Sequence, residues 1–254
     1  GKVLPKDCID TSPSSLLSCS TDATDLRMTL PMLVVSPRTT EQIQAVVRLA
    51  NEMDFSLVPR GGGSGLTGGA IPSDNRTVIL SLSKLKKILY VNKDDKVLCT
   101  QTGVITLDAI KAAGAEGLLF TVDPASKAAS SIGGNISENS GGPFAFEYGT
   151  TLDNILSYKM VTPTGTVIEV ERRGHPRHKI LPEEEALFDV KGEDGQILHT
   201  VTLGGDQIRQ SGLGKDVTNK FLGGLPGVQK EGVDGIITEG CFTLYDTLDH
   251  SRVL

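Results

Sequence analysis

The residues best suited to chemistry form a glycine-rich stretch, VPRGGGSGLTGG, from Val58 to Gly69. Six of these residues are glycine, and ordering each one costs about 0.5–1 kcal/mol relative to alanine in regular structure. The flanking segments SLVP and TVILSL have the composition of buried strands, which argues against a disordered linker. A glycine loop after a strand lets successive main-chain N–H groups point inward and approach phosphate oxygens, and Ser64 and Thr67 would add hydroxyl donors. A purely structural turn is the alternative.

Two common phosphate-binding motifs do not fit this loop. The loop of nucleotide triphosphatases requires G-x-x-x-x-G-K-[ST], and the stretch contains no lysine. The dinucleotide fingerprint G-x-G-x-x-G is matched in overlapping registers, but it should open a helix, and the following AIPSDNRTVILSL offers none. A Rossmann domain is therefore not expected.

A second small-residue stretch, SSIGGNISENSGGP, runs from Ser130 to Pro143. Two Gly-Gly pairs flank Asn135 and Asn139, whose amides offer hydrogen-bond donors and acceptors. Two such loops in one chain indicate a long polar ligand held at several points, and a dinucleotide fits that description.

The elements that must position these loops alternate irregularly between helix and strand. Residues 31–36 and 55–59 are expected as strands, and residues 40–53 between them as a helix, with apolar residues recurring at i, i+3, i+4 and i+7 from Ile43. Residues 1–30 are expected to be irregular. Further expected elements are strands at 77–82, 88–92, 96–101, 155–163 and 234–246, a helix at 106–114 capped by Gly114, and a hairpin at 186–203 turning at GEDGQ. The irregular order favours an α+β fold with two lobes.

Composition excludes several classes of protein. The 254 residues carry a net charge of −6 and no tryptophan, which argues against a nucleic-acid partner. No apolar run approaches the ~20 residues of a membrane span. The four cysteines show no C-x-x-C pair, so neither a metal site nor a disulfide framework is expected, and Cys99 and Cys241 are interpreted as packed core residues. The expected location is cytoplasmic, with a peripheral position on the inner face of the membrane as a second option.

Three separated motifs resemble one known family. VPRGGGSGLTGG, then the segment DPASKAASSIGGNISENSGGPFAFEYGTTLDNILSYKMVTPTGTV, then GIITEGCFTLY resemble the FAD-binding domain of the FAD-linked oxidases. This is the vanillyl-alcohol oxidase or PCMH-type group, and the similarity is greatest to its D-lactate and glycolate dehydrogenase branch. The resemblance spans roughly Pro31 to Tyr245 and implies an α+β fold of two subdomains with FAD between them.

The resemblance also implies which residues meet the cofactor. The pyrophosphate would be wrapped by Arg60, Gly61, Gly62, Gly63, Ser64, Gly65, Leu66, Thr67, Gly68 and Gly69. Near the flavin and ribityl chain would lie Asp123, Pro124, Ser126, Ser131, Gly134, Asn135, Asn139, Gly141, Gly142 and Gly149, with the main chain of Ile237 and Thr238. Arg60 either neutralises the pyrophosphate or braces the loop. No histidine accompanies Ser64, where some members attach FAD, so noncovalent FAD is expected.

The sequence departs from the family pattern in two places. A long link from about 171 to 214 contains the expected hairpin, which is either a docking surface for a partner or a solvent-exposed insertion. The family's Ser-Glu-Gly-Thr-Leu-Gly is replaced by KEGVDG at 230–235, which changes the chemistry of that loop. The subdomains are expected at about 30–92 and 93–246 of a single FAD-binding unit, 1–254, without the family's substrate-binding cap domain.

The expected function is the flavin domain of an oxidoreductase that oxidises a 2-hydroxy acid of the D-lactate or glycolate type. Electrons would pass to a quinone, a cytochrome or an iron–sulfur partner, in the same polypeptide or another. The alternatives are a noncatalytic flavin-binding or electron-transfer module and a flavin reductase of the cell-wall-precursor type. No catalytic residue is assigned. The GHPRH segment at 174–178 is interpreted as a solvated or partner-facing basic patch rather than a metal site.

Overall fold

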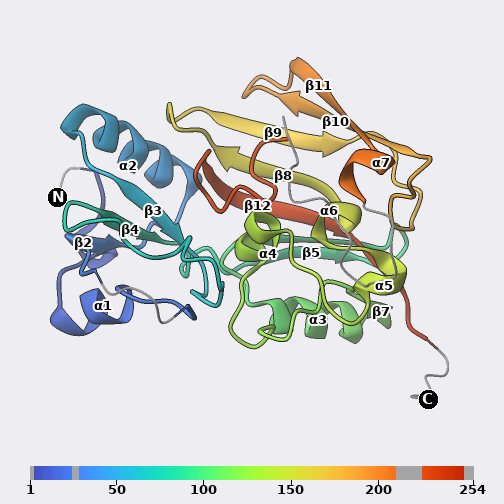
Figure 1. Ribbon diagram of the computed structural model, residues 1–254, viewed down its shortest axis with the longest axis horizontal. Coiled ribbons are helices and arrows are strands. Elements are labelled where there is room, and N and C mark those ends of the chain that lie inside the picture. Colours follow the sequence, from blue (N-terminus) through green and yellow to red (C-terminus); the bar gives the residue numbers. More distant parts are fainter. Residues whose placement is uncertain (1–2, 25–28, 210–224, 249–254) are drawn as a thin grey trace.

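Two lobes, each built on its own sheet, lie side by side in the computed structural model (Figure 1). The structure describes residues 3–24, 29–209 and 225–248. Residues 210–224 include the end of the predicted link from about 171 to 214, so that end lies outside the described residues.

The first lobe contains a four-stranded sheet in the order β1-β2-β4-β3. Strands β2 (Leu33–Val35), β4 (Val78–Ser81) and β3 (Leu57–Arg60) are parallel, and β1 (Ile9–Asp10) adds an antiparallel edge. The glycine loop therefore leaves the carboxyl end of a parallel strand, where ligands of such sheets usually bind.

Helix α2 (Thr40–Met53) packs beside this sheet and confirms the helix prediction. Its N-cap is Thr39, whose side chain accepts a hydrogen bond from the N–H of Gln42. The four positions of the predicted apolar stripe are all buried. Side chains of α2 also donate to the carbonyl groups of Pro163 and Gly165 in the second lobe, which fixes the two lobes against each other.

The N-terminal segment is more regular than predicted. It forms a 3-10 turn η1 (Lys6–Cys8), strand β1 and helix α1 (Pro13–Ser18). The helix begins with Ser12 as N-cap and Pro13 at its first position, a local signal that the expectation of an irregular segment overlooked. Strand β1 has no comparable local signal, because two residues form a strand only through pairing with β2.

The second lobe contains a seven-stranded antiparallel sheet in the order β11-β10-β9-β8-β12-β6-β5. The strands are β5 (Ile88–Asn92), β6 (Val97–Gln101), β8 (Ile155–Val161), β9 (Val167–Arg172), β10 (Glu185–Lys191), β11 (Ile197–Gly204) and β12 (Ile236–Thr243). The predicted hairpin is β10 and β11, and it extends this sheet at one edge. Strand β5, which the expected boundary near residue 92 assigned to the first lobe, pairs with β6 here.

Helices α3 (Thr106–Ala115) and α4 (Ile132–Glu138) cover one face of the large sheet (Figure 1). Helix α3 runs past Gly114, so the predicted cap was wrong; the left-handed residue is Gly117, with φ +75°. The remaining short elements are α5 (Ala145–Tyr148), α6 (Thr151–Asn154), α7 (Gly205–Ile208) and the pair β7 (Leu118–Leu119) and β13 (Tyr245–Asp246).

Helix α4 lies where a second glycine loop was expected. Ser131 caps it by accepting from the N–H of Gly134, and Asn139 ends it with φ 51°. Ile132 and Ile136 are fully buried on its inner side. Burial of this face outweighs the low helix propensity of its two glycines, which is why the local sequence was misleading.

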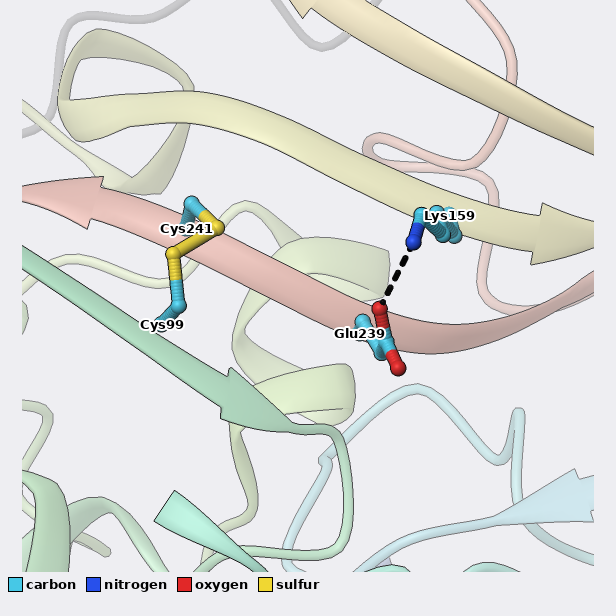
Figure 2. The surroundings of a disulfide bond; sticks show 4 residues. All are labelled: Cys99, Lys159, Glu239 and Cys241. Carbon is cyan, nitrogen blue, oxygen red and sulfur yellow. Dashed lines mark ion pairs between the residues drawn. A yellow bond between two sulfur atoms is a disulfide. The ribbon is translucent and has the colours of Figure 1, made fainter. Parts of the chain in front are cut away.

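Strands β6 and β12 are joined by a disulfide between Cys99 and Cys241 (Figure 2). The two residues lie directly opposite each other, with Cα atoms 4.1 Å apart and a sequence separation of 142. The expectation of no disulfide was therefore wrong, although Cys99 is buried as expected. The spacing in sequence carried no signal, because the pair is created by the register of strands far apart in the chain.

The predicted solvated patch at 174–178 is exposed at Arg177, but His175 and the neighbouring Arg172 turn inward. Arg172 is 7% exposed and donates to the carbonyl oxygen of Asp153, as does His175 Nε2. Burial, with the nearby Arg172 charge, lowers the pKa of His175 to about 4. Asp153 is itself buried against Arg209, so this cluster ties the insertion to α6 instead of facing a partner.

Candidate cofactor site

A cavity of about 290 Å³ lies where the two lobes meet. The glycine loop after β3 forms one wall, and α4 with the segment before it forms another. Residues 231–237, at the start of β12, close the remaining side. Of the predicted cofactor residues, the cavity is lined by Gly61, Gly62, Gly63, Ser64, Gly65, Leu66, Thr67, Gly69, Ser126, Ser131, Gly134, Asn135 and Ile237.

The glycine loop lies so close to the second lobe that side chains would not fit. A Cβ atom on Gly62 would lie 1.9 Å from the carbonyl oxygen of Ala129. A Cβ atom on Gly61 would lie 2.2 Å from Oγ of Ser131. These glycines are therefore required by close approach of two main-chain segments, as the sequence predicts for a loop of this type.

The main-chain N–H groups of the loop are available to a ligand. Within the described part of the chain, no N–H group from Gly61 to Gly69 donates a hydrogen bond. Unpaired N–H groups in a folded protein normally find water or a ligand as acceptor. A run of them along a cavity wall is suited to an anion with several oxygen atoms, such as a diphosphate.

Arg60 braces this loop. Its guanidinium donates to the carbonyl oxygens of Ala70 and Ser18, 3.0 and 3.3 Å away, and so connects both ends of the loop to the N-terminal segment. A Cβ atom on Gly63 would lie 2.3 Å from Nη2 of the same side chain. Of the two roles considered for Arg60, these contacts support the structural one.

Asn135 lines the cavity, and its amide side chain is buried. Its side chain is 0% exposed, and its Nδ2 donates to Thr106 Oγ1 at 2.9 Å. Its Oδ1 has no hydrogen-bond partner among the described residues. A buried amide oxygen without a partner is costly, so a ligand that donates a hydrogen bond here would relieve that cost.

Three carboxylates also line the cavity, from Asp22, Glu138 and Glu231. Burial and the neighbouring Glu231 charge raise the pKa of Glu138, while a hydrogen bond with Thr67 opposes this shift. Side chains therefore do not make the cavity electropositive. Attraction for a phosphate must come from the main-chain N–H groups of the loop.

Several predicted residues support the cavity instead of lining it. These are Arg60, Gly68, Asp123, Pro124, Asn139, Gly141, Gly142, Gly149 and Thr238. Asn139 Oδ1 accepts from the N–H of Leu152 at 2.8 Å, which holds α4 against α6. A Cβ atom on Gly142 would lie 2.1 Å from Asp123 Oδ1, so these two segments are also in close contact.

Other lining residues were missed by the sequence interpretation. They are Asp22, Pro59, Ala70, Leu82, Ser130, Gly133, Ser137, Glu138, Ser140, Glu231, Gly232 and Gly235. Asp22 had no signal, because the N-terminal segment reaches the cavity only after folding. Glu231, Gly232 and Gly235 belong to the altered KEGVDG segment, which the structure nevertheless brings to the site.

No helix among residues 3–24, 29–209 and 225–248 is long and apolar enough to cross a bilayer. The same ranges contain no cluster of three histidine, cysteine, aspartate or glutamate side chains placed to hold a metal ion.

Curated relatives are similar to this chain over 55–66% of its length. Glycolate oxidase subunit GlcD of Bacillus subtilis (strain 168) is 37% identical over 159 residues, which cover 63% of this chain and 34% of the relative. D-2-hydroxyglutarate dehydrogenase of Xanthomonas citri pv. viticola is 37% identical over 170 residues, which cover 66% of this chain and 36% of the relative. D-lactate dehydrogenase of Anaerostipes hadrus is 39% identical over 140 residues, which cover 55% of this chain and 29% of the relative. The matches span about a third of the length of these relatives.

Solved structures agree on the fold. An alkyldihydroxyacetonephosphate synthase structure is 22% identical, covers 97% of this chain and 39% of its own, and has a TM-score of 0.68. This likeness supports the α+β architecture of two subdomains. The FAD binding domain family matches residues 31–171, which include the glycine loop and α4. By this match the chain belongs to the FAD binding domain family, with FAD as its cofactor.

Proposed function

We propose that this chain is the flavin-binding part of an enzyme that oxidises a 2-hydroxy acid of the D-lactate or glycolate type. FAD would supply the hydride acceptor, as flavins do in such oxidations. The proposal for the substrate is supported by the names of the similar relatives, which include glycolate oxidase, D-lactate dehydrogenase and D-2-hydroxyglutarate dehydrogenase.

The proposed FAD site is the cavity between the lobes. The N–H groups from Gly61 to Gly69 would bind the diphosphate, and the unpartnered Oδ1 of Asn135 would accept a hydrogen bond from the ribityl chain or flavin ring. Ile237, at the opposite wall, would contact the cofactor through its main chain. The unpaired run of loop N–H groups is the observation that carries the proposal.

We further propose that FAD is held without a covalent bond. No histidine among the described residues lines the cavity, and Ser64 occupies the loop position where a histidine would be needed. Acid precipitation should therefore release all flavin into the supernatant. Flavin that stays with the pellet would contradict this part of the proposal.

The electron acceptor would be a quinone, a cytochrome or an iron–sulfur partner, and the proposed location is cytoplasmic. The residues that would act as acid or base on the substrate are not assigned. Reoxidation of substrate-reduced protein by each acceptor class in turn would test the first point, and cell fractionation the second.

The decisive experiment has two steps. The protein is first titrated with FAD, and binding is followed by quenching of flavin fluorescence. The loaded protein is then mixed without oxygen with D-lactate, glycolate or D-2-hydroxyglutarate, and visible flavin absorbance is recorded, with L-lactate as the matched control. Bleaching by one of the first three acids but not by L-lactate is expected. Tight FAD binding without bleaching by any of them, repeated with the full-length protein, would favour a noncatalytic flavin module.

A further inference from the structure

We propose that the Cys99–Cys241 disulfide is a reversible clamp that holds the FAD cavity in its binding shape. Reduction of this bond would weaken FAD binding. The proposal rests on the proposed FAD site, but it concerns residues outside the cavity, and neither cysteine lines it.

The disulfide sits on the face of the large sheet away from α4. Gly240 and Phe242, on either side of Cys241, face the helices: a Cβ atom on Gly240 would lie 3.0 Å from Ile136, and Phe242 packs edge-on against Phe120. Cys241 therefore points to the opposite face, as does Glu239, two residues earlier (Figure 2). Cys99 is 1% exposed, whereas Cys241 is partly exposed.

The two bonded strands lead directly to the cavity. Three residues after Cys99, the N–H of Thr102 donates to the carbonyl oxygen of Thr238 at 3.1 Å. The hydroxyl of Thr102 donates to the carbonyl oxygen of Ile237 at 2.8 Å, and Ile237 lines the cavity. The disulfide and these hydrogen bonds therefore join the same two strands, with the hydrogen bonds at the cavity end.

Thr102 also supports helix α4. Its carbonyl oxygen accepts a hydrogen bond from the N–H of Gly133 at 2.8 Å. A Cβ atom on Gly133 would lie 2.8 Å from the Cβ of Thr102, so α4 is in close contact with the residue that follows β6. Because Gly133 and the adjacent Gly134 line the cavity, a shift of Thr102 would displace the cavity wall.

Strand β12 is tied on its other side as well. Lys159 of β8 lies 3.1 Å from Glu239 (Figure 2). Along β12, Glu239 stands between Cys241 and Ile237, which lines the cavity. The hydrogen bond with Glu239 raises the pKa of Lys159, so the lysine stays charged at neutral pH. Strand β12 is thus fixed to β8 by an ion pair and to β6 by a covalent bond, and only the covalent bond responds to a reductant.

Reduction would change the spacing of β6 and β12. Two thiol groups need more room than a bonded pair, because non-bonded sulfur atoms stay at van der Waals separation. Cys99 is buried, and Tyr90 and Ser157 flank the pair on the neighbouring strands, so we expect part of the room to come from movement of the strands. Interfaces packed this closely transmit small shifts instead of absorbing them.

The chemistry is thiol–disulfide exchange with a dithiol. A thiolate of the dithiol attacks the sulfur of Cys241, the partly exposed residue of the pair, and Cys99 leaves as a thiolate that takes up a proton. The second thiol of the reductant then displaces Cys241 and closes a disulfide of its own. The protein gains two electrons and two protons, and the dithiol loses them. Disulfides in reducing compartments are usually transient or redox-sensing, which agrees with a reversible bond in the proposed location.

The test measures FAD affinity of the 254-residue protein before and after treatment with dithiothreitol. Thiol titration should find two free thiols, Cys8 and Cys19, in the oxidised protein and four after reduction. The Kd for FAD, from fluorescence quenching, should rise about tenfold on reduction and return on reoxidation. Hydrogen exchange at the N–H groups of Thr102 and Gly133 should accelerate, while exchange in β10 stays unchanged.

Two double variants complete the test. The double variant Cys99→Val with Cys241→Val keeps apolar strand residues without the disulfide. It should bind FAD with the higher Kd of the reduced protein, and dithiothreitol should not change that Kd. Cys8→Ser with Cys19→Ser should behave like the parent protein. A folded valine variant that binds FAD as tightly as the oxidised parent would overturn the clamp, as would a Kd unchanged by reduction. Absence of FAD binding in both redox states would refute the cofactor site itself.

Discussion

Replacing Gly62 by alanine should separate the glycine loop from the second lobe. The new Cβ atom would lie 1.9 Å from the carbonyl oxygen of Ala129, and ordinary contact begins at 3.4 Å. The atoms nearest to this Cβ belong to the main chain of Ala129 and Ser130, so no side chain can rotate away. The glycine loop and the segment at 129–130 must therefore move apart by about 1.5 Å. A hydrogen bond to phosphate lengthened by that amount is lost.

The expected effect on cofactor binding follows from these lost bonds. If two charge-assisted hydrogen bonds to the diphosphate fail, at about 1.5 kcal/mol each, the loss is ~3 kcal/mol, or about a hundredfold in the Kd for FAD. The assay is fluorescence titration with FAD, with circular dichroism as the check on folding.

A matched control is available in the same chain. Gly114, inside α3, has no atom within 4 Å of an added Cβ, so Gly114→Ala should leave FAD affinity unchanged. It should also stabilise the fold by up to about 1 kcal/mol, because alanine is the better helix former. A Gly62→Ala variant that binds FAD within twofold of the parent would refute the close-approach argument.

Three further predictions concern charges. Glu231→Gln removes a carboxylate from the cavity wall and should lower the Kd for FAD roughly threefold to tenfold. The decrease in Kd should be larger at low salt, where charges are screened less. An increase in Kd would contradict the idea that this carboxylate repels the diphosphate. The pKa of His175 is about 4 in the folded state against 6.5, so the unfolded chain binds more protons between these values. Stability should then fall by up to about 3 kcal/mol as pH drops through that window, of which about 2 kcal/mol should appear in urea unfolding between pH 7 and 5. The His175→Gln variant should lose that part of the pH dependence. Asp153→Asn leaves Arg209 buried without its partner and should cost about 3–5 kcal/mol in urea unfolding, whereas a loss below 1 kcal/mol would mean that water screens the pair.

The sequence by itself determined the elements whose signals are local. The apolar stripe from Ile43 predicted α2, the GEDGQ turn predicted the β10–β11 hairpin, and the glycines from Gly61 predicted a loop in close main-chain contact. Each of these signals lies within one segment, because periodicity, turn chemistry and missing side chains act over a few residues.

Tertiary structure decided the features that depend on residues far apart in the chain. The pairing of Cys99 with Cys241, the burial of His175 beside Asp153, and the approach of Asp22 to the cavity all arise from strand register and lobe packing. Helix α4 belongs to the same group, because burial against the large sheet overrides the weak helix propensity of its glycines. A sequence records which groups can interact, but the distance between them is set only when the chain closes its long loops, and that step leaves no local pattern to read.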